Sequence, residues 1–238
     1  MYLEAAHWSK EQVAQMRAHF LDNVAGHVLT VTHDVELYRR IVLGVPGSSF
    51  YRYEVVTWPG HVAIAGDMGS YVFERIDDMF EFFRGRTAGE YLDLSYLAGK
   101  CEAADKHAGL SEWVGEARSL DALAEILRES MDPDDGFAPT QADRIVAEWR
   151  KRVADDYGEM SSVDDVRELA DCYRPDPDWP RDPFADLWDR GRMFYEWSHH
   201  FAWCIFAIAF AVDKYDEHKQ QQLVVEAARL GVVPGAGV

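Results

Sequence analysis

Hydrophobic and polar residues alternate along residues 49–57, and this period of two predicts a β-strand with one buried face and one solvated face. The turn Pro59-Gly60 follows the strand. Because a Pro-Gly pair favours a type II turn, whose twist suits a two-residue hairpin poorly, we expect a bulge or a longer loop there. The alternation resumes at Val62 and Ile64, which predicts a second, antiparallel strand.

A Gly-Asp-Met-Gly turn at residues 66–69 tolerates positive φ angles, and β-favouring residues over 71–74 predict a third strand, so the three form a meander. The period then changes to that of a helix, with apolar residues at Ile76, Met79, Phe80 and Phe83. We expect this helix, with Asp77 and Asp78 in its first turn, to lie on the sheet.

The N-terminal part of the chain predicts one helix and two further strands. Ser9 and Gln12 have the spacing of a capping box, which marks the start of a helix over residues 9–24. Strands are expected over residues 28–32 and 38–45. The sheet would then contain four or five mainly antiparallel strands, within the usual range.

The pattern after residue 84 is almost entirely helical. It predicts helices over residues 91–97, 122–130 with Ser119 as the cap, 184–194, 197–215 and 217–230, and two that begin at Thr140 and Ser162. Four prolines within residues 173–184 predict an extended connection. The longest apolar run, residues 201–212, is shorter than the roughly 20 residues that cross a bilayer, so we expect a buried helix.

These patterns predict an α+β fold in a single domain, residues 1–238. Residues 1–90 would form an antiparallel β-meander packed by helices. Residues 91–238 would form a largely α-helical C-terminal half, wrapped around the helix of residues 197–212.

Composition adds a strong negative charge to this picture. The net charge is −18, and the acidity lies in the second half: residues 1–100 carry 13 acidic and 9 basic side chains, whereas the remainder carries 29 and 15. Such a surface argues against direct binding to nucleic acid or to an anionic membrane, because both require Lys and Arg to replace counterions. It permits a basic partner.

Cellular location is indicated by the cysteines and by the N-terminus. Cys101, Cys172 and Cys204 are an odd number without metal-type spacing, as expected of reduced thiols in the cytoplasm. The N-terminus lacks the basic patch and apolar core of a signal peptide.

The run T-W-P-G-H-V-A-I-A-G-D-M-G-S-Y-V-F-E-R-I-D-D-M-F-E-F-F-R, residues 57–84, resembles the signature of a group of uncharacterised proteins of tailed bacteriophages and prophages. The resemblance covers about a fifth of the chain when the preceding strand is included. It implies a phage product that acts in the cytoplasm of the bacterial host, on host metabolism or host defence. It brings no assigned catalytic or binding residue.

Three residues of this run are candidate site residues: the pair His61 and Asp67, and Trp58. His61 and Asp67 flank one short strand, and an imidazole near a carboxylate can act in general acid–base catalysis. The alternative for Asp67 is a structural role, through hydrogen bonds to its own turn. Trp58 is a candidate platform for stacking a ring, or else a buried anchor.

Three arginines are candidates for holding an anionic ligand or substrate: Arg39, Arg52 and Arg84. We expect no metal and no cofactor. His27, His33 and Asp34 suggest half of a metal site, but the adjacent His199 and His200 point about 100° apart on a helix and do not complete it easily.

Two acidic segments have ordinary explanations beside functional ones. Residues 132–136 resemble a calcium-binding loop, but the glycine is at the fifth position and no glutamate is at the twelfth, which favours an acidic turn. The acidic pairs of the helical half can imitate a phosphate backbone or simply keep the surface soluble. They are Asp155-Asp156, Asp164-Asp165 and the group Asp176, Asp178 and Asp182.

The sequence favours a phage accessory protein that binds a host component, either a defence protein or its nucleotide signal, without catalysis. The motifs of nucleotide hydrolysis and serine hydrolysis are missing. The alternatives are an enzyme of unfamiliar motif that uses His61 and Asp67 on a small anionic substrate, and a virion or assembly component. Strand edges also allow a homo-oligomer.

Overall fold

The computed structural model describes residues 8–86, 93–131, 139–172, 183–185, 187 and 191–230, and the structural statements below concern these residues. They fall into two compact units. Residues 8–110 and 197–230 form one, called here the sheet unit, and residues 111–196 form the other, the helical unit. The division expected near residue 90 does not follow these units, and the single domain remains a prediction.

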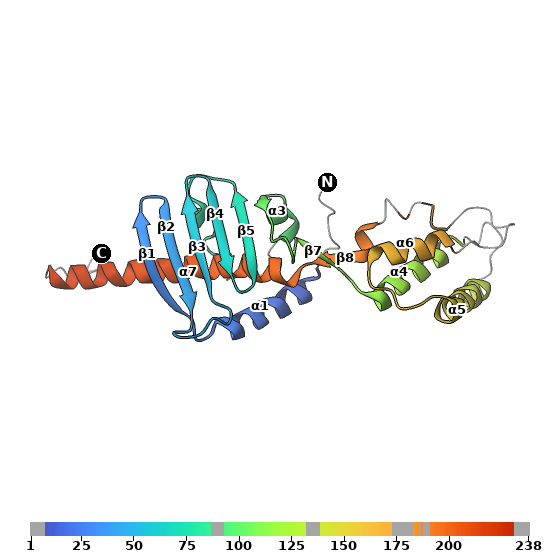
Figure 1. Cartoon of the computed structure of the whole chain (residues 1–238). Coiled ribbons are helices and arrows are strands. Elements are labelled where there is room, and N and C mark those ends of the chain that lie inside the picture. Colours follow the sequence, from blue (N-terminus) through green and yellow to red (C-terminus); the bar gives the residue numbers. More distant parts are fainter. Residues whose placement is uncertain are drawn as a thin grey trace. The chain divides into compact units, whose positions relative to one another are not determined.

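The sheet unit contains six antiparallel strands in the order β1-β2-β3-β4-β5-β6, so the predicted α+β class is confirmed (Figure 1). The strands are β1 Val28–Val35, β2 Tyr38–Gly44, β3 Tyr53–Trp58, β4 His61–Gly66, β5 Gly69–Glu74 and β6 Cys101–Ala103. The prediction of four or five strands was one short. Strand β6 is too brief to show an alternation, and it is fixed by pairing with β5 at Val72 and Phe73.

Both expected turns of the meander are two-residue hairpin turns. Gly66 pairs with Gly69 as predicted, but the bulge or longer loop at Pro59-Gly60 was wrong, because Trp58 pairs directly with His61. Gly60 has φ +83°, which suits the third position of a type II turn. Its N–H donates to the Asp77 carbonyl at 3.0 Å, and its own carbonyl accepts from the Arg75 N–H at 3.1 Å. These two bonds hold a turn that the strand twist alone disfavours.

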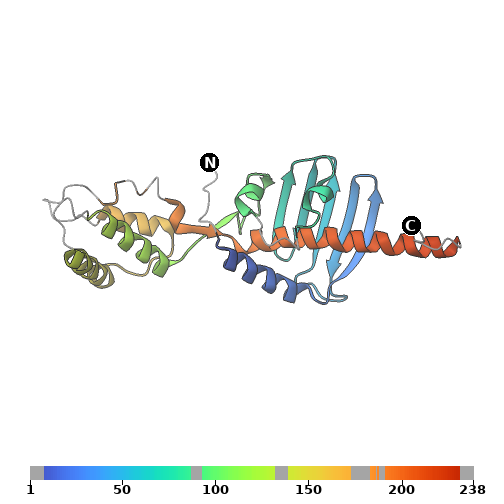
Figure 2. The same ribbon diagram turned by 180° about the vertical axis from the view of Figure 1, so that it is seen from behind.

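Helices cover one face of this sheet. They are α1 Lys10–Val24, α2 Met79–Phe83 and α7 His199–Arg229. In Figure 2, α7 runs in front of the strands. The ring of Phe20 in α1 packs against the rings of Trp203 and Phe206 in α7. The strand residues that point to these helices are buried: Ile41, Leu43, Tyr53, Val55, Val62, Ile64, Tyr71 and Phe73. The short helix α3 Leu94–Ala98 lies near α2, through the Phe82 and Tyr96 rings.

Three helix predictions for this unit need correction. The helix expected from Ile76 begins at Met79, because the Asp78 carboxylate accepts a hydrogen bond from the Phe80 N–H and caps it. Ile76 itself is 37% exposed. The main cover of the sheet is α7, and this is one helix of 31 residues where the sequence predicted two. None of the described helices is both long enough and apolar enough to span a membrane.

The opposite face of the sheet is called here the open face, because neither α1, α2 nor α7 lies on it (Figure 1). Its side chains are half-buried or exposed at alternate strand positions. They include Val42, Glu54, Val56, Ala63, Ala65 and Val72.

The helical unit has a core of its own. Its helices are α4 Glu116–Glu129, α5 Pro139–Asp156 and α6 Val163–Cys172, with a short 3₁₀ helix Gly191–Phe194 and the paired strands β7 Ser111–Trp113 and β8 Tyr195–Trp197. Leu123, Leu127, Trp149, Val166 and Leu169 lie in this core. The helical half is therefore not wrapped around α7, as the sequence predicted, since α7 belongs to the sheet unit.

The structure confirms two of the helices predicted for the helical unit and corrects two other predictions. The helix near Thr140 and the helix capped by Ser162 are confirmed. Ser119 is not a cap but a buried residue within α4, where it accepts a hydrogen bond from the Trp113 ring N–H at 2.8 Å. The helix expected over 184–194 is wrong over its described residues, because residues 184, 185 and 187 lie in turns and Gly191–Phe194 is 3₁₀. The segment 173–182 and the turn 132–136 lie outside the described residues.

Candidate functional site

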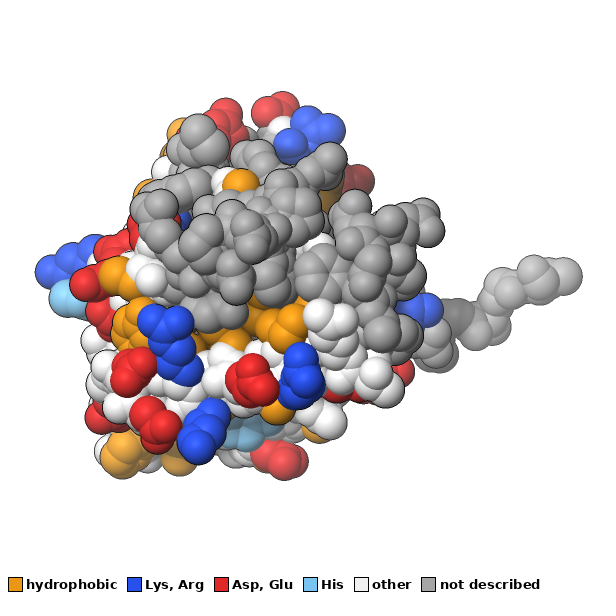
Figure 3. Space-filling model, turned by 90° about the vertical axis from the view of Figure 1, so that its right-hand side faces the viewer, with side chains coloured by type: hydrophobic (Ala, Val, Ile, Leu, Met, Phe, Trp, Pro, Cys, Tyr) orange, Lys and Arg blue, Asp and Glu red, His pale blue; other side chains and the backbone are white. Residues whose placement is uncertain are grey.

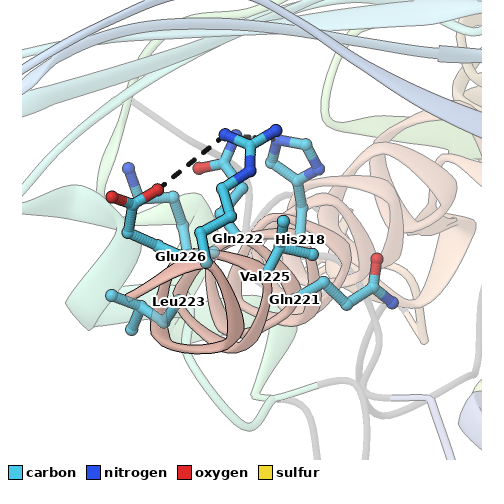
Figure 4. Close-up of a pocket in the computed structure, with 8 residues that line it drawn as sticks. His218, Gln221, Gln222, Leu223, Val225 and Glu226 are labelled. Atoms are coloured by element: carbon cyan, nitrogen blue, oxygen red, sulfur yellow. Dashed lines mark hydrogen bonds and ion pairs between the residues drawn. The ribbon is translucent and has the colours of Figure 1, made fainter. Parts of the chain in front are cut away.

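A recess of about 570 Å³ lies along the C-terminal part of α7 (Figure 4). Its described lining comes from this helix alone, and its polar groups bond to one another. Glu226 pairs with Arg229 at 3.9 Å, and the Gln222 amide lies 2.9 Å from the His218 ring nitrogen. A second recess in the helical unit contains Arg150, which Asp121 already neutralises at 2.6 Å.

Arg39, a predicted ligand-binding residue, is engaged in holding the fold. Its guanidinium makes two bonds to the Asp78 carboxylate, at 2.7 and 3.0 Å, and lies over the rings of Phe80 and Tyr215. Its side chain is only 11% exposed. Burial opposes the charged form, but the bonds to Asp78 outweigh it, so the pKa of Arg39 is raised. Arg39 therefore joins strand β2 to the start of α2.

Arg84 is occupied in a similar way. Its guanidinium binds Asp216 of α7 through two hydrogen bonds of 2.6 and 3.1 Å, and this partner raises its pKa. The pair is half-exposed, so its contribution to stability is modest.

His61 and Asp67 are not brought together. They lie at opposite ends of β4, about 20 Å apart at a strand rise of about 3.3 Å per residue. His61 instead stacks on Trp58, with ring centroids 5.0 Å apart, and its Nε2 lies 3.7 Å from the Glu74 carboxylate. Trp58 is thus half-buried beneath a histidine, on the open face.

Asp67 has a structural task at the other end of the sheet. Its carboxylate accepts a hydrogen bond from the Tyr51 N–H at 2.8 Å, and its own N–H donates to the Arg52 carbonyl at 3.0 Å. Tyr51 has φ +53°, a left-handed conformation that is costly for a residue with a side chain. The strand predicted over 49–57 therefore begins only at Tyr53, and Asp67 holds the turn before it.

A hollow of about 310 Å³ lies on the open face beside this turn. Strands β1 and β2 supply its floor and the loop between β2 and β3 its rim. Apolar side chains, hydroxyl groups, two glycines and a single charged side chain line it: Val28, Thr30, Thr32, Val42, Gly44, Val45, Pro46, Gly47, Ser48 and Arg52. We call it the Arg52 hollow.

Arg52 differs from the other arginines whose side chains the structure describes. Each of those has a carboxylate, hydroxyl or carbonyl partner, or another polar or ring contact. Arg52 has no such partner among the described residues, although the chain has 42 acidic and only 24 basic side chains. A cation left unpaired in so acidic a protein is available to an external anion.

Arg52 is an exposed residue whose stem and backbone are restrained by neighbouring strands. Its stem lies against Gly44: a Cβ atom at Gly44 would come within 2.9 Å of the Arg52 Cγ. Its backbone is bonded on both sides, to Ser49 at 3.2 Å and to Asp67 at 3.0 Å. This preorganisation reduces the entropy that an arginine loses when it binds a ligand.

Two further groups beside Arg52 suit a ligand. The Ser48 hydroxyl accepts from the Phe50 N–H at 3.1 Å, and its own hydrogen remains able to donate. The Phe50 ring is 76% exposed, more than any other large hydrophobic residue described. Phe50 is not among the residues that line the hollow; it precedes Arg52 by two residues, and an exposed ring of this kind can stack on a flat ligand.

The suggested histidine metal site does not form. Among the described residues, no group of three or more His, Cys, Asp or Glu side chains could hold a metal ion. Asp34 binds the Tyr215 hydroxyl at 2.8 Å and the Lys219 ammonium at 3.0 Å, and His33 is exposed. The three cysteines are free thiols, as predicted, with Cys101 and Cys204 buried.

The acidic pairs of the helical unit are local. Asp164 pairs with Arg167 at 2.9 Å, Asp165 accepts from the Ser161 and Ser162 N–H groups, and Asp156 pairs with Arg152. Acidic and basic side chains lie side by side on the face that Figure 3 shows. Asp176, Asp178 and Asp182 are outside the described residues.

Sequence reasoning named Arg52 but did not single it out, because ion pairing across strands is invisible in a linear pattern. The signal that could have found it is the glycine at residue 44, two positions before Pro46, in an otherwise well-formed strand. No family model, no curated protein and no solved structure matches the chain.

Proposed function

We propose that this protein binds a phosphate-bearing small molecule of the nucleotide class in the Arg52 hollow and holds it without turnover. In the phage context that the signature implies, the ligand would be a nucleotide signal of the bacterial host, bound in its cytoplasm. The observation that carries the proposal is the guanidinium of Arg52, which has no partner among the described residues and lines a hollow with the hydroxyl groups of Thr30 and Ser48.

The chemistry of the lining fits this class of ligand. A guanidinium matches the geometry of a phosphate, and the hydroxyl groups of Thr30 and Ser48 can add donors, whereas the Thr32 hydroxyl already donates to the Arg40 carbonyl. Phe50 offers a face for a base. A volume of about 310 Å³ is at the lower end for small-molecule pockets, which suits a mononucleotide or one half of a larger nucleotide.

Binding without turnover follows from what the lining offers. Its described residues carry donors and apolar surface, with no carboxylate or imidazole in a position to move a proton. His61, the imidazole of the competing enzyme hypothesis, lies at the far end of the sheet. A protein that removes a signal molecule by binding it needs a high affinity for that molecule, and the donors and apolar surface of this lining can provide affinity.

Calorimetric titration with inorganic phosphate, mononucleotides and cyclic dinucleotides tests the proposal. We expect a nucleotide to bind, to be recovered chemically intact by chromatography, and to bind about 10- to 100-fold more weakly to Arg52→Gln, since a charge-assisted hydrogen bond contributes about 1.5–3 kcal/mol. Arg75→Gln is the matched control: it removes the same charge from an exposed arginine bonded to the Tyr96 hydroxyl. Equal affinity of the wild type and Arg52→Gln would refute the proposal.

A further inference from the structure

Two histidines from distant parts of the chain meet where α1 packs against the first turn of α7. The Nε2 atom of His199 lies 3.4 Å from the Nδ1 atom of His19, and the ring centroids are 5.4 Å apart. From the sequence, we considered His199 as a metal ligand only together with its neighbour His200. The real partner is 180 residues away.

The separation of these two nitrogens is informative. Hydrogen bonds from nitrogen donors usually close to about 2.9–3.0 Å, so 3.4 Å is long for a bond between the two rings. Two imidazole nitrogens that ligate one tetrahedral zinc ion, each about 2.05 Å from it, lie about 3.3 Å apart. The observed distance is thus close to the distance between two nitrogen ligands of one tetrahedral zinc ion.

The helices that carry the two rings are fixed to each other. Phe20, next to His19, packs edge-on against Trp203, with ring centroids 5.2 Å apart, and the Trp203 ring N–H donates to the Asn23 side-chain oxygen at 3.1 Å. A site on two packed helices keeps its geometry better than one on a loop. His19 is exposed and His199 half-buried, so an ion in solution can reach both.

His200 itself is set at nearly a right angle to His199, with ring centroids 6.0 Å apart, and is not part of the pair.

We propose that His19 and His199 together bind a divalent transition-metal ion of the class that prefers imidazole, such as Zn²⁺, and that the ion joins α1 to α7. Water or an external ligand would fill the remaining positions, because the described residues offer no third protein ligand beside the pair. The proposal is independent of the Arg52 hollow.

Thermal unfolding of the metal-free protein with added Zn²⁺ tests the site, in a Cys172→Ser background that removes the exposed thiol. We expect the Tm to rise with Zn²⁺ at pH 7.5, to return on addition of a chelator, and to stay flat in His19→Ala and in His199→Ala. The exposed His33 supplies the control, because His33→Ala should keep the full response.

A second measurement covers the case in which an alanine variant folds poorly. Co²⁺ added to the wild type should give visible absorption bands of a nitrogen-ligated ion, and His19→Asn should lose them while its circular dichroism remains native. Two results would overturn the proposal: a Tm response of equal size in the histidine variants, which would show adventitious binding only, or a wild type that does not respond to Zn²⁺.

Discussion

Single residues decide what this protein can bind. Arginine is the residue that most readily recognises phosphate, yet most described arginines of this chain are already neutralised by carboxylates. Arg52 is kept apart from any carboxylate partner, and two neighbours hold it there: Gly44, which makes room for its stem, and Asp67, which bonds its turn. Asp67 thus helps to hold the turn that carries Arg52.

Gly44→Ala tests the first of these contacts. The added methyl group would meet the Arg52 stem at 2.9 Å and must displace it, while strand β2 accepts alanine without backbone strain. We expect a folded protein whose nucleotide affinity falls several-fold. Calorimetry beside far-ultraviolet circular dichroism provides the measurement, and an unchanged affinity would mean that Arg52 is not positioned by this contact.

Asp67→Ala tests the second contact. The change removes the hydrogen bond that holds Tyr51 in its left-handed conformation, so the turn should relax and the unfolding free energy should fall by about 1–2 kcal/mol. Nucleotide affinity should fall with it. Denaturant unfolding gives the first value; if Asp67→Ala kept both stability and affinity, the turn would not depend on the carboxylate.

Secondary-structure elements show how far the sequence could be interpreted. The meander, α1 with its capping box, and the start of α5 were all predictable, because each depends on local periodicity or on a cap within four residues. The errors arose where distant contacts decide. Strand β6 exists through pairing with β5, and α7 continues past residue 215 because Tyr215 and Lys219 bind Asp34 on β1. The position of Arg52 was equally beyond local patterns.

Acid sensitivity should reveal the polar contacts between α7 and the sheet. Burial raises the pKa of Asp34, but the hydrogen bonds from Tyr215 and Lys219 outweigh this effect and leave the pKa below its usual value. Burial likewise raises the pKa of Asp78, and the hydrogen bonds from Arg39 outweigh it, so that this pKa is also lowered. A carboxyl group with a depressed folded pKa stabilises the protein above its unfolded pKa, near 3.9, and loses this effect as the pH falls through the folded value.

The Tm should therefore drop more steeply below about pH 4 in the wild type than in Asp34→Asn, which no longer carries the titrating group. Asp121→Asn, which removes an exposed carboxylate from the helical unit, is the control and should follow the wild-type profile. Identical profiles for the wild type and Asp34→Asn would show that this contact does not stabilise α7.

At the scale of the whole molecule, the two units differ in what they offer. The helical unit buries its apolar residues in its own core and presents mixed charges. The sheet unit covers one face with α7 and leaves the other open, with the Trp58–His61 stack at one end and the Arg52 hollow at the other. The open face is therefore where we expect ligand recognition.

Nuclear magnetic resonance of the full-length ¹⁵N-labelled protein, titrated with a nucleotide that calorimetry has shown to bind, tests this account most directly. It predicts saturable shifts that cluster at the amides of Thr30, Gly44, Ser48 and Arg52, with the Trp58 and His61 signals unmoved. Shifts confined to Trp58 and His61 or to the helical unit, with the Arg52 hollow silent, would contradict it.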